Sequence, residues 1–332
     1  MSYKIGLANI SDADKIIDFI KNNWKKNHIV TNKEFLLYEF GDGLNLNFVI
    51  AKNEYGEILG LIGFIKKSYG LSVPDIFTSF WKVLDDVKVP SLGIEIFNYL
   101  RKNIPHRSFM GVGINEKIIP IFKLFKMFTS EMQQYYMLNQ FIDEYQIAVV
   151  KNNKVGIANQ INSNLKVLTL IEDTIALESI DFNRFSSNIP FKDSIYIEKR
   201  YFSYPIHKYD VYSIGDNGII VLREVYVNNS KIARIVDFVG DISLIPKIAG
   251  DLYYIMVENN YEYIDFLNYG IKDDILSIAG FEKLDYSNDE IIVPQYFSPF
   301  LRENKKIYFF ADTSNENFII CKADGDQDRP SI

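Results

Sequence analysis

The chain has 332 residues, of which 48% are hydrophobic, so it can bury a sizeable core, and its length favours about two domains. Its 43 acidic residues outnumber 36 basic ones, and the formal net charge of −7 argues against a broad nucleic-acid-binding surface. Cys321 is the single cysteine, which excludes an intramolecular disulfide and a cysteine metal cluster. The N-terminus has no signal-peptide pattern, and no run approaches the roughly 20 apolar residues that span a bilayer. We therefore expect a cytoplasmic protein that holds no metal and contacts neither membrane nor nucleic acid.

The first half of the chain alternates strand and helix patterns. Ser11 is expected to cap the first helix, and the Asn-Glu-Tyr-Gly turn at 53–56 predicts a hairpin because apolar runs flank it. The predicted strands are 3–9, the two strands of the hairpin at 46–65, then 76–84, 108–114, and two further strands that end at residue 150. The predicted helices are 14–24, 32–40, a helix that follows 88–93, and 115–127. The order is therefore β-α-α-β-β-β-α-β-α-β-β.

The stretch "KVPSLGIEIF" at 88–97 places a turn before a helical apolar pattern. Ser91 can accept a hydrogen bond from an early helical N–H, and Gly93 lets the backbone approach a ligand closely because it has no Cβ. The first N–H groups of a helix have no internal partners and lie at the positive end of its dipole, so a diphosphate would suit them. An ordinary capped surface helix would show the same residues.

This order resembles that of the GCN5-related N-acetyltransferase superfamily. The loop that holds the coenzyme A pyrophosphate in that family matches Lys88, Ser91 and Gly93, with Lys in place of Gln or Arg and Ser in place of the first Gly. The resemblance implies acyl-CoA as co-substrate, bound by Val87, Lys88, Val89, Ser91, Leu92, Gly93, Ile94, Asn115 and Phe122.

Two of these positions have a specific meaning in the family. Asn115 matches the position that usually contacts the pantetheine arm of coenzyme A. Phe122 occupies the position where many members carry a Tyr that protonates the leaving thiolate. Phenylalanine cannot donate a proton, so the resemblance leaves that role vacant or gives it to water or another residue.

The second half repeats the pattern of the first. A polar, Asn-rich stretch at 151–164 separates the halves, and the elements that follow it again give hairpin, strand, helix, strand and helix. We therefore expect a mixed α/β (α+β) protein with two tandem domains of this fold, residues 1–152 and 163–332, each with a mostly antiparallel sheet flanked by helices. In the second half, Asp241 lies at the helix start equivalent to residues 88–93 of the first half. Its carboxylate would repel a diphosphate, so coenzyme A is expected in the first domain alone.

The polar phrases of the second half narrow the resemblance. "EKRYFSYPIHKYD", "ARIVDFVGD", "YEYIDF", "VPQYFSPF" and "KADGDQDRP" make the chain similar to tandem-domain sugar N-acyltransferases. That resemblance implies acyl transfer to the amino group of a nucleotide-linked deoxysugar, of the dTDP type, in surface polysaccharide (O-antigen) biosynthesis. The candidate acceptor-binding residues are Asn27, Arg200, Tyr201, Arg234, Asp237, Glu262, Asp265, Asp326 and Arg329. A second interpretation stays open, because buried carboxylates in apolar strands need partners and the arginines could simply pair with them.

His28 and Asp86 are the candidate catalytic positions. The ordinary pKa of histidine, near 6.5, suits proton removal from an ammonium group, although an exposed loop histidine is the simpler interpretation of His28. A backbone amide around Asp86 to Lys88 is expected to stabilise the oxyanion during direct transfer. The alternating Asp324, Asp326 and Asp328 do not fit an EF-hand loop, which would need a glutamate beyond the end of this sequence.

Two other functions stay open at this point. An aminoacyl-tRNA-dependent transferase can also have tandem domains of this fold, but the acidic net charge disfavours an RNA surface. A non-catalytic ligand-binding protein is compatible with Phe122 and with the incomplete match of the phosphate loop.

Overall fold

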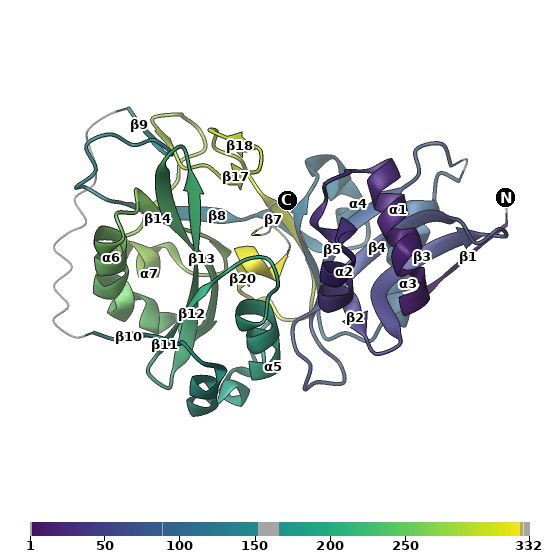
Figure 1. Cartoon of the computed structure of the whole chain (residues 1–332), viewed down its shortest axis with the longest axis horizontal. Helices are drawn as coiled ribbons and strands as arrows, with labels where there is room; N and C mark the ends of the chain where they lie inside the picture. The colour runs from purple at the N-terminus through teal and green to yellow at the C-terminus, as the bar shows by residue number, and fades with distance from the viewer. Residues whose placement is uncertain (1, 88, 152–165, 326–327, 329–332) are drawn as a thin grey trace.

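The computed structural model describes residues 2–87, 89–151, 166–325 and 328, and Figure 1 shows that they form two lobes. Each lobe is built on an eight-stranded sheet with helices on it, which confirms the mixed α/β class and the two tandem domains. Among the described residues, no helix has the length and apolarity to cross a membrane.

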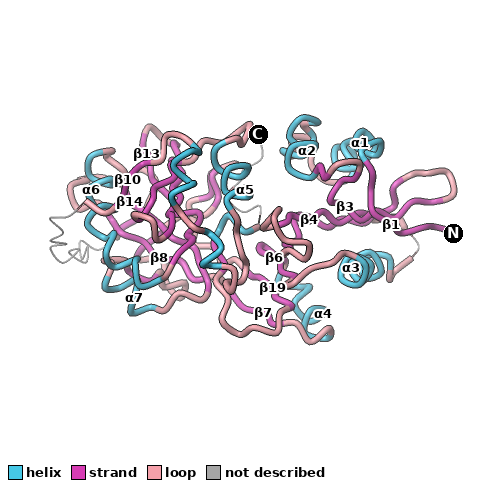
Figure 2. Tube along the Cα trace, turned by 90° about the horizontal axis from the view of Figure 1, so that it is seen from below, coloured by secondary structure: helices cyan, strands magenta, loops and turns pink. Residues whose placement is uncertain are grey.

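The first sheet has the strand order β1-β3-β4-β5-β6-β19-β7, with β2 at the side of β3. Its strands are β1 (Tyr3–Asn9), β2 (Gly41–Asp42), β3 (Asn45–Asn53), β4 (Ile58–Lys66), β5 (Ile76–Val83), β6 (Phe109–Ile114), β7 (Phe128–Glu131) and β19 (Tyr308–Asp312). Its helices are α1 (Ala13–Asn23), α2 (Lys33–Phe40), α3 (Leu92–Asn103) and α4 (Ile119–Leu124). Figure 2 shows α1 and α2 on one face of the sheet and α3 and α4 on the other.

The second sheet has the order β10-β11-β12-β13-β14-β8-β15, with β20 at the side of β14. Its strands are β10 (Leu168–Leu170), β11 (Asp210–Ile214), β12 (Gly218–Val227), β13 (Ser230–Gly240), β14 (Tyr263–Tyr269), β8 (Gln133–Leu138), β15 (Glu282–Lys283) and β20 (Ile320–Cys321). The helices of this half are α5 (Ser194–Ile197), α6 (Ala249–Glu258) and α7 (Asp273–Ile278). Two short ribbons, β9 (Val149–Val150) with β16 (Ile291–Ile292) and β17 (Tyr296–Phe297) with β18 (Phe300–Leu301), lie outside both sheets.

The two sheets exchange one strand each. β8 follows β7 in the chain but pairs with β14 of the second sheet, while β19 comes from the far end of the chain and lies between β6 and β7 of the first. The strand orders match position by position, and each sheet has one parallel pair, β5 with β6 and β13 with β14. The halves are therefore equivalent in topology and are tied together by hydrogen-bonded strands. The predicted division between residues 152 and 163 lies outside the described residues.

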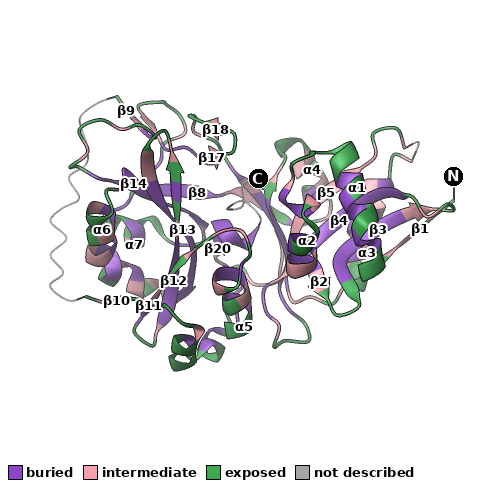
Figure 3. Cartoon of the chain, in the orientation of Figure 1, coloured by how far each residue is buried: buried purple, intermediate pink, exposed green. Residues whose placement is uncertain are grey.

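Most predicted elements are present, and the differences have local causes. Ser11 does not cap the first helix with its side chain: Asn9 accepts a hydrogen bond from the backbone N–H of Ser11 at 3.0 Å and starts a short 3₁₀ turn before α1. The segment 174–202 contains short 3₁₀, α and π turns, which no periodic pattern in the sequence predicts. Figure 3 shows that buried residues follow both sheets and continue where the two lobes meet.

Candidate functional site

The parallel strands β5 and β6 part after three residue pairs. Ile76, Phe77 and Thr78 pair with Phe109, Met110 and Gly111, and the pairing ends there although β5 runs on to Val83 and β6 to Ile114. Two parallel strands that separate inside a sheet leave an opening through it, and here Thr78 and Gly111 form its closed end.

A bulge on the other edge of β5 lies at the same level. Phe64 of β4 pairs with Thr78 of β5, and Ile62 pairs with Trp81. Two residues of β5, Ser79 and Phe80, therefore lie opposite one residue of β4, Gly63. A bulge of this kind bends its strand and redirects its backbone groups. Here it turns β5 away from β6 and starts the opening.

A cavity of about 430 Å³ fills the opening. Its lining comes from both faces of the sheet: Trp24, His28 and Phe80 pack on the α1/α2 side, whereas Phe97 and Phe122 belong to the core under α3 and α4. The remaining lining residues are Thr78, Ser79, Trp81, Lys82, Val112, Gly113, Ile114, Asn115, Ile118 and Phe310. The cavity therefore joins the two faces of the sheet between β5 and β6.

Two residues of the predicted coenzyme A set, Asn115 and Phe122, line this cavity. Asn115 follows β6, and its side chain accepts a hydrogen bond from the backbone N–H of Lys117 at 2.9 Å, which caps the 3₁₀ turn before α4. Phe122 is buried in α4 and stacks on Phe310 at 4.2 Å between ring centroids.

The predicted phosphate loop has a different local chemistry from the one expected. Ser91 makes no side-chain cap; its hydroxyl donates to Glu95 Oε1 at 2.7 Å, and Tyr3 donates to Glu95 Oε2 at 2.7 Å. These hydrogen bonds lower the pKa of Glu95 and keep a carboxylate charged in the first turn of α3. That charge disfavours a diphosphate beside Ser91.

Packing accounts for most other positions of this loop. Gly93 faces Trp81 and Val83 of β5, and a Cβ there would make only ordinary contacts at 3.4 Å, so packing does not require a glycine at this position. Leu92 is buried, and the side chains of Val87 and Val89 pack against the same core. Ile94 is half-buried, and Lys88 lies outside the described residues.

His28 lies at the α1/α2 side of the cavity, where its ring stacks on Trp24 and meets Phe80 edge to face. Its Nδ1 accepts a hydrogen bond from the backbone N–H of Val30 at 3.3 Å, which caps a 3₁₀ turn. Burial lowers the pKa of His28 to about 4. The ring is therefore neutral at neutral pH, and because Nδ1 accepts a hydrogen bond, Nε2 carries the proton and can act as a donor.

Asn27 and Asp86 lie outside the cavity lining. Asn27 is exposed in the turn before His28, and Asp86 is exposed in the turn after β5. The strands part at Thr78, well before Asp86, because the bulge ends their pairing there.

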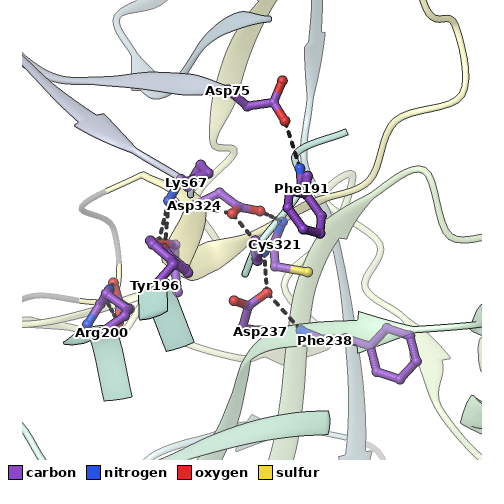
Figure 4. Close-up of polar contacts among 12 residues, drawn as sticks. Lys67, Asp75, Phe191, Tyr196, Arg200, Asp237, Phe238, Cys321 and Asp324 are labelled. Carbon is purple, nitrogen blue, oxygen red and sulfur yellow. Dashed lines mark hydrogen bonds and ion pairs between the residues drawn. The ribbon is translucent and has the colours of Figure 1, made fainter. Parts of the chain in front are cut away.

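A second polar cluster lies where the two lobes meet (Figure 4). The ammonium of Lys192 lies 2.5 Å from Asp237 Oδ1 and 2.8 Å from Asp324 Oδ1, and all three side chains are buried. Burial opposes the charge on Lys192, but the two carboxylates outweigh it and raise its pKa well above the ordinary value. Tyr201 donates to Asp237 Oδ2 at 2.5 Å. Asp237 is thus held by partners inside the protein.

Cys321 lies beside this cluster. Its sulfur and one oxygen each of Asp237 and Asp324 lie within 4.8 Å of one another, a spacing that could hold a metal ion. The Lys192 ammonium already supplies the positive charge between the two carboxylates. Burial raises the pKa of the Cys321 thiol well above its ordinary value, which makes it a poor nucleophile.

Arg200 is the centre of a buried aromatic cage. Its guanidinium binds both oxygens of Asp328 at 2.8 and 2.7 Å and lies over the rings of Tyr201, Tyr204 and Tyr209. Asp328 anchors the end of the described chain there. The neighbouring candidates Asp326 and Arg329 lie outside the described residues.

Arg234, Asp265 and Glu262 are also satisfied internally. Arg234 forms a two-point ion pair with Asp265 at 2.9 and 2.6 Å, and both side chains are buried. Glu262 accepts hydrogen bonds from three successive backbone N–H groups, those of residues 146–148, at 2.6 to 3.0 Å. These contacts favour structural pairing, one of the two interpretations of the sequence.

The second sheet has the equivalent opening, and the chain itself fills it. β13 and β14 pair over three residues, 233–235 with 264–266, and β13 has an extra residue, Val236, just beyond. β20 then pairs with β14, and the turn at Lys322–Asp324 packs against both strands. Asp241 caps the following turn by accepting from the backbone N–H of Ser243 at 2.8 Å. The cavity of the first sheet thus has a filled counterpart in the second.

Sequence reasoning missed the residues that form the opening itself. Thr78, Phe80 and Lys82 belong to a strand that was predicted, but its bulge leaves no pattern in the sequence. Phe310 was missed because its strand joins the first sheet from the other end of the chain. A strand prediction at 308–312 would have been the available signal, since "IYFFA" is rich in β-forming residues.

Comparison with known proteins supports the fold. The sequence matches no protein-family model and no curated protein. A GCN5-related N-acetyltransferase from Anabaena variabilis ATCC 29413 superposes with a TM-score of 0.54 and 11% identity, covering 95% of this chain and 73% of that one. A conserved protein of unknown function from Enterococcus faecalis V583, described as a probable N-acyltransferase, gives 0.56 and 9% identity, with 94% and 73% covered. A proposed acetyltransferase from Pyrococcus horikoshii gives 0.51 and 9%, with 96% and 92% covered. The chain therefore has the fold of two tandem GCN5-related N-acetyltransferase-like domains.

Proposed function

We propose that this protein is an acyl-CoA-dependent N-acyltransferase whose reaction takes place in the opening between β5 and β6. One observation carries the proposal: the cavity joins the two faces of the first sheet where its parallel strands part. Such a passage lets a thioester enter from one face and an amine from the other, so that the two reacting groups meet in fixed positions.

The donor enters from the α3/α4 face in this proposal. Asn115 offers an amide at the rim of the cavity, where it can hydrogen-bond the pantetheine arm. Trp81, which packs in the core under α3 and α4, lines the cavity on this face. The second domain takes no donor, because β20 and the Lys322–Asp324 turn fill its equivalent opening.

The acceptor approaches from the α1/α2 face, past Trp24, His28 and Phe80. Its neutral amine attacks the thioester carbonyl carbon, the new C–N bond forms, and the C–S bond breaks with release of the coenzyme A thiolate. The proton of the amine leaves to water. Backbone amides of the Ser79–Phe80 bulge are the donors we propose for the oxyanion, in place of those near Asp86.

For the acceptor we propose the amino group of a nucleotide-linked deoxysugar, as used in surface polysaccharides. This part rests on the sequence resemblance. The described acceptor candidates Arg200, Arg234, Asp237, Glu262 and Asp265 all have internal partners, so direct contacts to the sugar must come from other groups near the α1/α2 side.

Binding of the acceptor can be tested with two matched lysines. Lys82 pairs with Leu61, a residue of the core under α1 and α2, and therefore points to the acceptor face. Lys82 lines the cavity and pairs with Asp85, while Lys66 lies at the end of β4, pairs with Asp42 and does not line it. Their side chains are 23% and 24% exposed. Calorimetry should show binding of a dTDP-linked amino sugar weakened about tenfold by Lys82→Glu, since charge inversion repels its diphosphate, and unchanged by Lys66→Glu. Equal effects of both variants would contradict the site.

Turnover needs a separate assay. Thiol release from acetyl-CoA should depend on a dTDP-linked amino sugar, and aminoacyl-tRNA should not replace it. Donor binding without turnover of any amine would support the non-catalytic alternative, and turnover with aminoacyl-tRNA alone would replace the sugar proposal.

A further inference from the structure

The closed end of the cavity is built by a residue from the far end of the chain. Phe310 lies on β19, the exchanged strand, where it stands opposite Gly111 of β6. Gly111 is also the last residue that pairs with β5, through Thr78. Phe310 is therefore placed at the point where the two strands begin to part.

Gly111 leaves room that the Phe310 ring occupies. A Cβ at position 111 would lie 2.4 Å from Cε1 of Phe310 and 2.2 Å from Oγ1 of Thr78. The missing side chain on β6 is thus replaced by an aromatic ring from β19. This ring lines the cavity and is itself almost fully buried.

Other aromatic rings hold Phe310 in place. Phe122 stacks on it with an interplanar angle of 13°, and Phe97 and Phe109 meet it edge to face at 5.8 and 5.3 Å between centroids. Aromatic pairs of this geometry add stability beyond that of burial alone. These three contacts hold the ring at the closed end of the cavity.

We propose that Phe310 limits the length of the acyl group, so that the donors of this enzyme are short-chain acyl-CoA thioesters. The inference rests on the proposed function, because it concerns the donor in that same cavity. An acyl chain that runs between β5 and β6 toward Thr78 and Gly111 meets the Phe310 ring at the closed end. A longer chain would need space that the aromatic stack fills. Strand exchange thus lets the C-terminal part of the chain set the donor specificity of the N-terminal domain.

The test is a series of saturated acyl-CoA thioesters from acetyl to decanoyl, with binding measured by calorimetry and turnover by thiol release. The wild-type chain should bind the short members and lose affinity beyond a limiting length. Phe310→Leu should move that limit by about one methylene, with roughly a fourfold gain in affinity for the first thioester beyond the wild-type limit. Phe310→Ala should move it further, and Phe310→Leu decides the question if the alanine variant does not fold.

Phe309→Leu is the matched control. Phe309 is the neighbour of Phe310 on β19 and is also buried, but it faces the opposite side and packs on Tyr269 and Phe318. It does not line the cavity. Its replacement should leave the length profile unchanged while it destabilises the fold by a similar amount.

Three results would overturn the inference in different ways. Acetyl-CoA binding with the same length profile in wild type and both Phe310 variants overturns the role of Phe310 alone and leaves the proposed function intact. An equal shift of the limiting acyl length in Phe309→Leu would mean that a general loosening of the core, and not the loss of the Phe310 ring, causes the effect. Failure of the wild-type chain to bind any acyl-CoA overturns the proposed function, and this inference with it.

Discussion

Replacing Lys192 by methionine is expected to be one of the most damaging single changes in the protein. The substitution keeps an unbranched side chain of similar length but removes the ammonium that contacts Asp237 and Asp324 at 2.5 and 2.8 Å. Lys67 is the other nearby cation, and its Nζ lies 3.6 Å from Asp324 Oδ1. Among the described residues, Lys192→Met therefore leaves the fully buried Asp237 carboxylate without an ion-pair partner.

The magnitude follows from the cost of an uncompensated buried charge. Breaking a buried ion pair by removing one partner costs about 3–5 kcal/mol. Domains are stable by only about 5–15 kcal/mol, so the variant should lose a large fraction of its stability. Because Lys192 also contacts a second carboxylate, that of Asp324, we expect a loss of stability in the upper part of this range.

Urea denaturation followed by tryptophan fluorescence measures this loss. Lys231→Met is the control, because its ion pair with Glu224, at 3.2 Å, is one-third to one-half exposed and should contribute less than about 1 kcal/mol. Adding Asp237→Asn to Lys192→Met should recover part of the loss, since it removes the unpaired charge. A Lys192→Met protein as stable as Lys231→Met would refute the reasoning.

Three more predictions follow from other contacts. Arg234→Met should cost about 3–5 kcal/mol in the free energy of unfolding, again by urea denaturation, because it leaves the Asp265 carboxylate buried without its two-point partner. Gly111→Ala should cost about 1–3 kcal/mol in the same assay, since the added methyl group overlaps the Phe310 ring, and a neutral result would mean that β19 can shift. Because burial lowers the pKa of His28 to about 4, the unfolded chain takes up a proton between about pH 6.5 and 4 while the folded protein does not. As the pH is lowered from about 6.5 to 4, the free energy of unfolding of the wild type should therefore decrease by up to about 3 kcal/mol more than that of His28→Gln. Parallel pH curves of the two proteins would show that the ring is solvated.

The sequence predicted the elements well because most of them carry a local signal. The hairpin of β3 and β4 follows from two apolar runs around a turn, and the helix predicted over 32–40 is present as α2, with Asn32 as its cap. Repetition of the same order in the second half predicted the tandem duplication, which the two matching sheets confirm.

Features that depend on distant pairing could not be predicted in this way. Nothing local distinguishes β8 from β7, yet β8 joins the other sheet, and β19 crosses in the opposite direction. The bulge at Ser79–Phe80 depends on how two strands align, which single residues do not specify. The proposed reaction site therefore lies in the opening that the exchanged strand completes, and not only in the loop before α3 that sequence motifs favour.

The partners of buried charged residues could not be predicted from the sequence either. Arg234 and Asp265 were correctly singled out as unusual in apolar strands, but the sequence left open whether they pair or bind substrate. In the structure Arg234 and Asp265 form an ion pair, and Arg234 also donates to the backbone carbonyls of residues 294 and 295. A polar residue in an apolar strand indicates that a partner exists, and only the fold identifies it.

A crystal structure of the protein with acetyl-CoA would show whether the opening between β5 and β6 is the donor site. We expect the thioester between β5 and β6, the pantetheine arm beside Asn115, and the methyl end of the acetyl group toward Phe310. We expect no second ligand between β13 and β14, where β20 lies. Acetyl-CoA bound anywhere else, or a β5–β6 opening that stays empty at saturating ligand, would contradict the proposed site.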